Sequence, residues 1–297
     1  MGYELWTSPV TGYRRRGTRL NELQVLFASG VKTGAVLEPL QCCPLNANSI
    51  DIKAILDRRG FDVAGVQSAQ NGEVLGYVEA NALGGGRVSD HLKHLNSDMI
   101  ISDSTPLGEV FRYLRSKQWA FVTVGVGIRG IITRADLNKP PVRVYLFALI
   151  SLLEMHLRYW IRRGYPNDAW KSHLDERRLR RAQDLEKERC ESNDQISLLA
   201  CLQFADLRDL VISREDLRAN LNLASKTQAG RLLRRAEVLR NSLAHSQSDL
   251  IEGSNWEDMI ALLSMVELSV AHSDRSIEEA ARTLEQESPN LWSVDLM

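Results

Sequence analysis

The sequence predicts two domains of different class, a mixed α/β domain followed by an all-α domain. The chain has 297 residues, and at roughly 150 residues per domain this length suggests two domains. The sharpest break is Asn138-Lys139-Pro140-Pro141, because a proline disfavours helix at the residue before it. A weak internal repeat precedes this break, and helical periodicity dominates after it. We therefore expect domains over residues 20–140 and 141–287.

Each copy of the repeat is predicted to be a helix followed by a hairpin of two short strands. In the first copy the helix begins near Ser49. The expected strands cover residues 61–66 and 74–78, and the Asn71-Gly72 pair between them is a strong hairpin signal.

The second copy repeats this order with a different turn. Thr105 is the expected N-cap and Pro106 the first residue of its helix. Strands are expected over residues 119–124 and 128–132, joined by a glycine-containing turn. The two copies together predict a pseudo-symmetric pair with short mixed sheets.

The second copy ends in the motif Gly130-Ile131-Ile132-Thr133-Arg134-Ala135-Asp136. A hydroxyl at the end of a strand can bond a phosphate, and a carboxylate in the first turn of the next helix can accept two ribose hydroxyls. With this motif, residues 20–139 resemble a tandem CBS domain, also called a Bateman module. The resemblance implies an adenine nucleotide (AMP, ADP or ATP) as a regulatory ligand.

The resemblance also implies which residues form the nucleotide site. Thr133 and Asp136 would bind the phosphate and the ribose. The neighbouring residues expected to complete the pocket are Gly130, Ile131, Phe121, Val122, Thr123 and the stretch 101–105. In the first copy the matching positions hold Gly76, Glu79 and Ala82. A carboxylate there would repel phosphate, so we expect one nucleotide site, in the second copy.

After residue 140 the apolar spacing predicts a series of helices. A long helix is expected over 141–163. A charged helix or arm is expected over 171–189, where basic and acidic side chains are mixed. The other helices are expected over residues 196–210, 213–217, 226–244, 256–274 and 277–286.

The chemically informative residues of this half are Arg240, Asn241 and His245. An Arg followed by Asn, with His five positions after the Arg, closes a long predicted helix. On this motif the second half resembles a HEPN domain, a helical bundle that includes metal-independent ribonucleases. The first long helix of that family often carries an acidic residue, for which Glu154 is the candidate.

The motif residues suit cleavage of RNA by its own 2′-hydroxyl. His245 titrates near neutrality and can transfer protons, and Arg240 can stabilise the charge that develops on the phosphate. Asn241 would orient the phosphate or the imidazole. One Arg and one His make half a site, so the resemblance implies a homodimer with both motifs in one cleft. The alternative is a non-catalytic nucleotide sensor whose helical bundle binds a partner protein.

Composition excludes several other classes. A net charge of −1 excludes a strongly cationic protein that coats nucleic acid by charge alone, and DNA is not expected as a partner. No run of about 18 apolar residues suggests a membrane span, and four cysteines without zinc-like spacing suggest reduced thiols. We expect a cytoplasmic protein with no metal or catalytic cofactor, and the architecture suggests a stress-response or anti-phage toxin.

Overall fold

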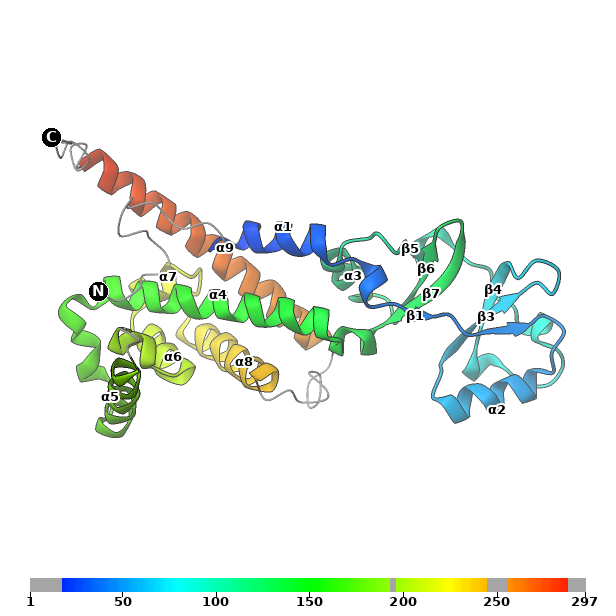
Figure 1. Cartoon of the computed structure of the whole chain (residues 1–297), viewed down its shortest axis with the longest axis horizontal. Coiled ribbons are helices and arrows are strands. Elements are labelled where there is room, and N and C mark those ends of the chain that lie inside the picture. Colours follow the sequence, from blue (N-terminus) through cyan, green and yellow to red (C-terminus); the bar gives the residue numbers. More distant parts are fainter. Residues whose placement is uncertain (1–17, 193–195, 245–255, 288–297) are drawn as a thin grey trace. The chain divides into compact units, whose positions relative to one another are not determined.

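The computed structural model describes residues 18–192, 196–244 and 256–287. It divides into two compact units (Figure 1), one formed by Leu26–Val142 and the other by Met1–Val25 together with Arg143–Met297. The first unit is mixed α/β and the second is helical, which confirms the predicted fold class in its coarse form. Residues before Leu26 group with the helical unit because Leu20 N donates to Asp274 Oδ2 at 3.0 Å.

The α/β unit contains two small sheets, one for each copy of the repeat. The first has the order β2-β3-β4, and the second has the order β1-β7-β6-β5. The strands of the first sheet are Cys42–Pro44, Val63–Gln67 and Val74–Glu79, with helix α2 over Ser49–Arg59. In the same order, the strands of the second are Glu38–Pro39, Gly127–Thr133, Trp119–Val124 and Ile100–Ser102, with helix α3 over Leu107–Leu114.

Both predicted hairpins are confirmed, and each has a glycine at the turn where the backbone is left-handed. Gly72 has φ 70° and Gly125 has φ 63°, a conformation that residues with a Cβ rarely adopt. The predicted cap of α3 is wrong. Pro106 stands at the N-cap, and the hydroxyl of Thr105 instead accepts from Ser102 N at 3.1 Å. The Thr105 side chain therefore stabilises a local turn and does not cap α3.

The outer strand of the second sheet comes from the segment before the first copy. β1 pairs antiparallel with β7, with Pro39 opposite Gly130. In the first copy the segment after the hairpin takes the matching place, since Lys93 bridges Tyr77 next to Gly76. A Cβ at Gly76 would lie 2.4 Å from Lys93 O. Glycine therefore lets this segment lie against the hairpin.

The two sheets share a small apolar core. Val63, Tyr77 and Phe121 are buried in it, and the rings of Tyr77 and Phe121 lie 5.3 Å apart between centroids. A separate cluster fills the first copy between its sheet and α2, with Leu56 and Val66 among its buried residues.

In the helical unit the long helix α9 contacts both α4 and α8 (Figure 1). Helix α1 covers Leu20–Gly30. The other α-helices of this unit are α4 Pro140–Gly164, α5 Glu176–Glu191, α6 Phe204–Ser213, α7 Glu215–Ala219, α8 Lys226–Ala244 and α9 Trp256–Glu287. Two predicted boundaries are wrong. The helix expected over 196–210 begins at Phe204, because Gln203 and Asp206 form a capping box there, and the two helices expected over 256–286 are one.

By length and hydropathy, α4 could cross a membrane. Its most apolar 18-residue window has a mean hydropathy of 1.3, but 56% of that window is buried inside the structure. Side chains along α4 also make polar contacts with α9: Tyr145 Oη donates to Glu267 Oε1 at 2.6 Å, and Trp160 Nε1 donates to Ser273 Oγ at 2.7 Å. Burial and polar contacts with a neighbouring helix are typical of a core helix of a folded protein.

A buried polar cluster joins α4 to α9. His156 and Ser273 are both 0% exposed, and His156 Nδ1 lies 2.6 Å from Ser273 Oγ. His156 Nε2 lies 3.5 Å from Asp274 Oδ1. Because buried polar groups are costly when they lose a partner, this cluster fixes the register of the two helices.

An ion-pair network joins α5, α6 and α8. The carboxylate of Asp206, 1% exposed, accepts from Arg181 Nη2 at 2.9 Å. Arg178 donates to Asp209 at 2.8 Å, and Arg208 pairs with both Asp209 and Glu237. Partial burial raises the pKa of Asp209, but hydrogen bonds from Arg178 and Arg208 outweigh it and hold that pKa below its usual value.

The cluster on α9 gives the first prediction. Ser273→Ala removes the acceptor of the buried Trp160 Nε1, so we expect the free energy of unfolding to fall by about 1–3 kcal/mol. Chemical denaturation measures it. Ser264→Ala on the same helix is the matched control, because Ser264 is half-buried, and its loss should cost under about 0.5 kcal/mol. Equal effects of the two variants would contradict the role given to Ser273.

Candidate functional site

The second copy ends in a strand-to-helix junction where Thr133 and Asp136 contact each other. β7 ends at Thr133, and a short 3-10 helix, η5, covers Arg134–Asn138. Asp136 Oδ2 accepts hydrogen bonds from Thr133 N at 2.7 Å and from Thr133 Oγ1 at 3.1 Å. The pair forms a capping box. Asp136 is 6% exposed, so most of the surface of this residue is covered by the protein.

The other oxygen of Asp136 is bound by a lysine that the sequence analysis did not single out. Lys139 Nζ lies 2.9 Å from Asp136 Oδ1 and 2.5 Å from Glu38 Oε1, and it donates to Val36 O at 2.5 Å. Partial burial lowers the pKa of Lys139, but its hydrogen bonds to Glu38 and Asp136 outweigh this and raise the pKa above its ordinary value. The ammonium is therefore a permanent positive charge at neutral pH.

The sheet register sets the spacing of the residues that the sequence predicted to line one pocket. Thr133 lies opposite Trp119 at the start of β6, whereas Thr123 lies near the end of β6 beside Ser102. Four residues of strand separate Trp119 from Thr123, about 13 Å at 3.3 Å per residue. Thr123 therefore lies about 13 Å along the strand from the residue that pairs with Thr133. The stretch 101–105 is linked to the junction through another segment, since Asp103 O accepts from Gly34 N at 2.8 Å and Val36 O accepts from Lys139. That all these residues line one nucleotide pocket stays a prediction.

The remaining predicted pocket residues build the sheet itself. Phe121 and Val122 are both 0% exposed, so their side chains belong to the interior. Ile131 pairs with Phe121 across the hairpin. Gly130 lies under the preceding segment, where a Cβ would meet Leu37 Cδ1 at 3.0 Å. Of the predicted nucleotide residues, the structure brings together Thr133 and Asp136.

Trp119 is the residue that the register adds to this end of the sheet. It is paired with Thr133, so the two side chains are on the same face. Its ring is partly buried against the cluster that contains Phe121. An aromatic ring beside a hydroxyl and a carboxylate can stack on a nucleobase. Hairpin register counted from the glycine turn could have found Trp119 in the sequence.

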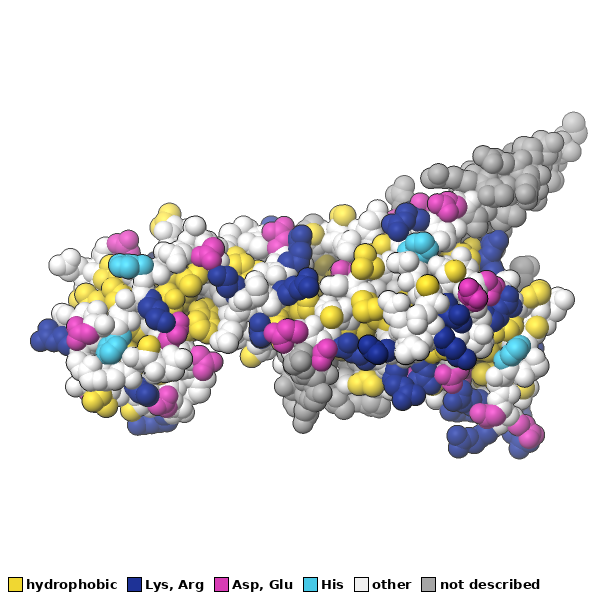
Figure 2. Space-filling view, turned by 180° about the vertical axis from the view of Figure 1, so that it is seen from behind, with side chains coloured by type: hydrophobic (Ala, Val, Ile, Leu, Met, Phe, Trp, Pro, Cys, Tyr) yellow, Lys and Arg dark blue, Asp and Glu magenta, His cyan; other side chains and the backbone are white. Residues whose placement is uncertain are grey.

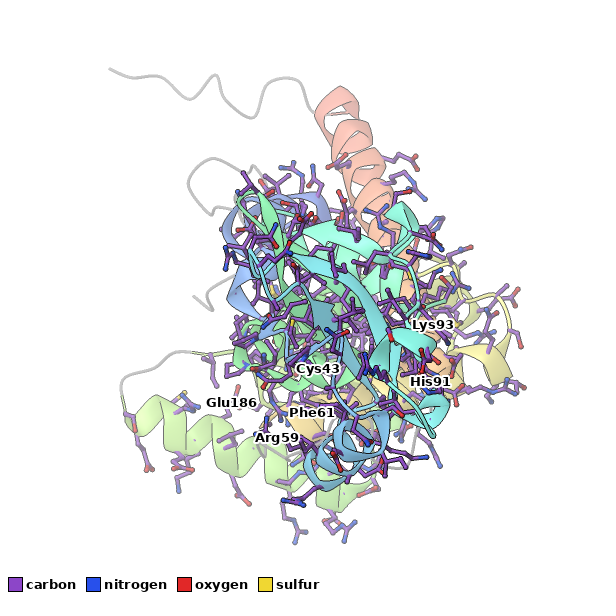
Figure 3. All side chains as sticks on the ribbon, turned by 90° about the vertical axis from the view of Figure 1, so that its right-hand side faces the viewer. Cys43, Arg59, Phe61, His91, Lys93 and Glu186 are labelled. Atoms are coloured by element: carbon purple, nitrogen blue, oxygen red, sulfur yellow. The ribbon has the colours of Figure 1, made fainter. Side chains whose placement is uncertain are left out.

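The matching junction of the first copy is an ion pair. Glu79, at the position of Thr133, lies with Oε1 2.9 Å from Lys93 Nζ, and Lys93 belongs to the segment beside β4 (Figure 3). Ala82 stands where the second copy has Asp136. This junction has neither the hydroxyl nor the carboxylate of the second copy.

In the helical unit, α8 presents a basic face that leads to the Arg240-Asn241 pair. Arg231, Arg234, Val238 and Asn241 follow at helical spacing, and all four are exposed. No hydrogen bond or ion pair engages the side chains of Arg231 and Arg234 within the described ranges. On the face seen in Figure 2, basic and acidic side chains are interspersed. Two adjacent unpaired arginines on one helix can attract a polyanion.

The other predicted catalytic residues are Arg240, Asn241, His245 and Glu154, and the structure describes three of them. Arg240 Nη1 donates to Asn241 Oδ1 at 3.3 Å, and His245 lies outside the described residues. Glu154 is bound to Arg158 at 2.5 Å with its side chain 13% exposed. In the part of the chain that the structure describes, no hydrogen bond or ion pair joins Glu154 to Arg240 or Asn241. The one partner of Glu154 among the described residues is thus Arg158, one helical turn away on α4.

Groups of metal-binding side chains are absent from the described residues: no three His, Cys, Asp or Glu side chains come together as a metal site. His91 Nε2 lies 3.0 Å from Gly85 O. The four cysteines are free thiols, and burial raises the pKa of Cys43 to about 11.

Comparison with known proteins finds similar solved structures that each cover about two fifths of this chain. No protein-family model matches the sequence, and no curated protein matches it either. Among solved structures, one similar chain is an uncharacterised conserved protein from Pyrococcus horikoshii, 16% identical, with a TM-score of 0.33, covering 37% of this chain and 90% of that one.

Two further similar structures are CBS-domain proteins with a bound nucleotide. One is the CBS domain of a bacterial CNNM/CorC family Mg²⁺ transporter in complex with ATP, 14% identical, with a TM-score of 0.33, covering 40% of this chain and 92% of that one. The other is CBSX2 in complex with AMP, 19% identical, with a TM-score of 0.34, covering 39% and 98%. At these identities and scores the likeness assigns neither a family nor a ligand to this chain.

Proposed function

We propose that this protein is a metal-independent endoribonuclease whose activity responds to an adenine nucleotide. The observation that carries the ribonuclease half is the exposed face of α8. Its unpaired Arg231 and Arg234 lead to Asn241 and the adjoining Arg240. Unpaired guanidiniums suit phosphate oxygens because they present donors in a fixed fork.

The motif supplies the groups that RNA cleavage by the 2′-hydroxyl requires. A base must take the hydroxyl proton, an acid must protonate the leaving 5′-oxygen, and a cation must stabilise the charge on the phosphorane. His245 would transfer the protons and Arg240 would supply the positive charge. Because each chain has one such pair, we propose that two chains combine their motifs in a homodimer.

The proposal of nucleotide binding is supported by the residues at the end of the second sheet. Asp136 and Thr133 meet there beside the Trp119 ring, so a carboxylate for ribose hydroxyls, a hydroxyl for phosphate and a ring for the base share one face. The first copy carries Glu79 and Ala82 at the matching positions, which would repel phosphate and leave the ribose without an acceptor. We therefore propose one nucleotide per chain.

A second candidate function is a non-catalytic nucleotide sensor whose helical unit binds a partner protein. The observation in its favour is a set of exposed apolar side chains. Val144 and Phe147 on α4 are 58% and 49% exposed, and Leu268 on α9 is 63% exposed. Val144 and Phe147 lie one helical turn apart, and exposed apolar residues on one helix face are typical of protein-binding surfaces.

RNA cleavage in the presence of EDTA separates the two candidates. We expect the wild-type protein to cut RNA and to leave 2′,3′-cyclic phosphate or its hydrolysis product, because the internal hydroxyl is the nucleophile. Arg240→Ala and His245→Ala should each lower the rate by about 100-fold or more. Arg275→Ala is the matched control, an exposed arginine on α9, and it should cleave normally.

Two outcomes of this assay would contradict the ribonuclease. Absence of cleavage by the wild-type dimer favours the non-catalytic sensor. Cleavage that requires a metal ion and leaves a 5′-phosphate excludes the 2′-hydroxyl mechanism.

The basic face of α8 is tested by the salt dependence of RNA binding. Arg231→Ala and Arg234→Ala should each weaken RNA binding and lower the slope of log K against log salt by about 1.

Nucleotide binding is tested by calorimetry with AMP, ADP and ATP. Asp136→Asn keeps an oxygen for the Thr133 cap but loses the charge that strengthens both ribose hydrogen bonds. We expect roughly 10- to 100-fold weaker binding. Glu79→Gln in the first copy is the control and should change the affinity less than about 2-fold. Binding by the wild type no tighter than about a millimolar for all three nucleotides would contradict the nucleotide half.

A further inference from the structure

The candidate ribose carboxylate has no free oxygen. Oδ2 of Asp136 holds the Thr133 cap, and Oδ1 holds the ammonium of Lys139 at 2.9 Å. A ribose that donates two hydroxyls to this carboxylate needs acceptor sites on a residue that is 6% exposed. The capping bonds belong to the local backbone turn, whereas the bond to Lys139 comes from a long side chain that can move. Lys139 is therefore the partner that a ligand would displace.

Lys139 has other acceptors that can retain it after such a displacement. Its ammonium also contacts Glu38 Oε1 and Val36 O, each at 2.5 Å. Glu38 belongs to β1, which pairs with β7 beside the junction. The ammonium thus stays charged and paired when Asp136 is taken by another donor, so the exchange leaves no buried charge without a partner.

In the first copy the outer segment also supplies one partner of an ion pair, with the opposite charge. Lys93 lies opposite Tyr77 on β4, as Glu38 lies opposite Ile131 on β7. In the first copy the lysine on the added segment binds the strand-end Glu79 at 2.9 Å. No carboxylate stands at Ala82 to be shared, so the first ion pair has no connection to a candidate ribose acceptor. In the second copy the ion pair and that acceptor are one cluster.

We propose that Lys139 and the ribose hydroxyls of the ligand compete for Asp136, an inference that rests on the proposed nucleotide site. Lys139 thereby sets the affinity of the site for its ligand, and the bonding of Lys139 changes when the ligand binds. The residue is well placed for this, because Lys139 N donates to Asp136 O at 3.1 Å and Lys139 O accepts from Val142 N at 3.0 Å, within the first turn of α4. Occupancy of Asp136 changes the bonding of the residue from which α4 starts.

The test uses adenosine and AMP against the full-length protein, with two variants expected to act in opposite directions. Lys139→Met removes the competitor, so adenosine should bind about 10-fold more tightly. Glu38→Gln leaves Asp136 as the only carboxylate that holds the ammonium, so adenosine should bind more weakly. Adenosine carries no phosphate, and a smaller gain for AMP than for adenosine in Lys139→Met would show that the freed ammonium also attracts phosphate.

The outcomes separate this proposal from the nucleotide site itself. Unchanged or weaker adenosine binding by Lys139→Met, with binding by the wild type, overturns the competition and leaves the site standing. Changes of the same sign in Lys139→Met and Glu38→Gln also overturn it, because they would reflect stability, which thermal unfolding of both variants measures. If neither the wild type nor any variant binds adenosine or AMP, both the proposed nucleotide site and the proposed competition are contradicted.

Discussion

The α/β unit depends on the pairing of an outer segment with each hairpin, which places a backbone segment against a glycine in both copies. Gly76 and Gly130 occupy the same position in the two hairpins, and each lies beneath a segment that comes from outside its own copy. A side chain at Gly76 would meet a carbonyl oxygen at 2.4 Å, so the segment could not pair with the strand. The outer strand of the second sheet brings Glu38 to Lys139, and Lys139 to Asp136. The pairing of β1 with β7 thus determines the electrostatics of the candidate nucleotide site.

The helical unit uses a different principle, in which buried polar groups fix helices that apolar packing alone would leave free to slide. Apolar side chains along α4 fit many registers, but the bonds from Trp160 and His156 to Ser273 fit one. Asp206 does the same for α5 and α6 through Arg181. Losing one partner of such a group costs more than losing a comparable apolar contact, since the other partner stays buried.

The two candidate sites differ in how their charges are arranged. At the end of the second sheet the charges are mutually neutralised, so a ligand must compete with internal partners. On α8 the exposed guanidiniums of Arg231 and Arg234 have no partner among the described residues, so no described side chain competes with a polyanion there. A selective small-molecule site and a less selective nucleic-acid surface have these respective properties, since desolvated pairs discriminate between ligands and exposed charges mainly attract them.

The sequence by itself determined the elements whose signals are local. The proline pair located the start of α4, the glycine turns located both hairpins, and helical periodicity located α8. It also identified Thr133 and Asp136 as a pair, because three residues across a strand end bring those side chains together. The tertiary structure alone decided the rest. It showed Lys139 and Glu38 on the carboxylate, since Glu38 and Asp136 are far apart in the sequence and meet through β1. It set the distance along the sheet between Thr123 and Thr133 through the hairpin register, and it paired Glu154 with Arg158. Local spacing shows which side chains share a face, but only long-range pairing shows which charges neutralise one another.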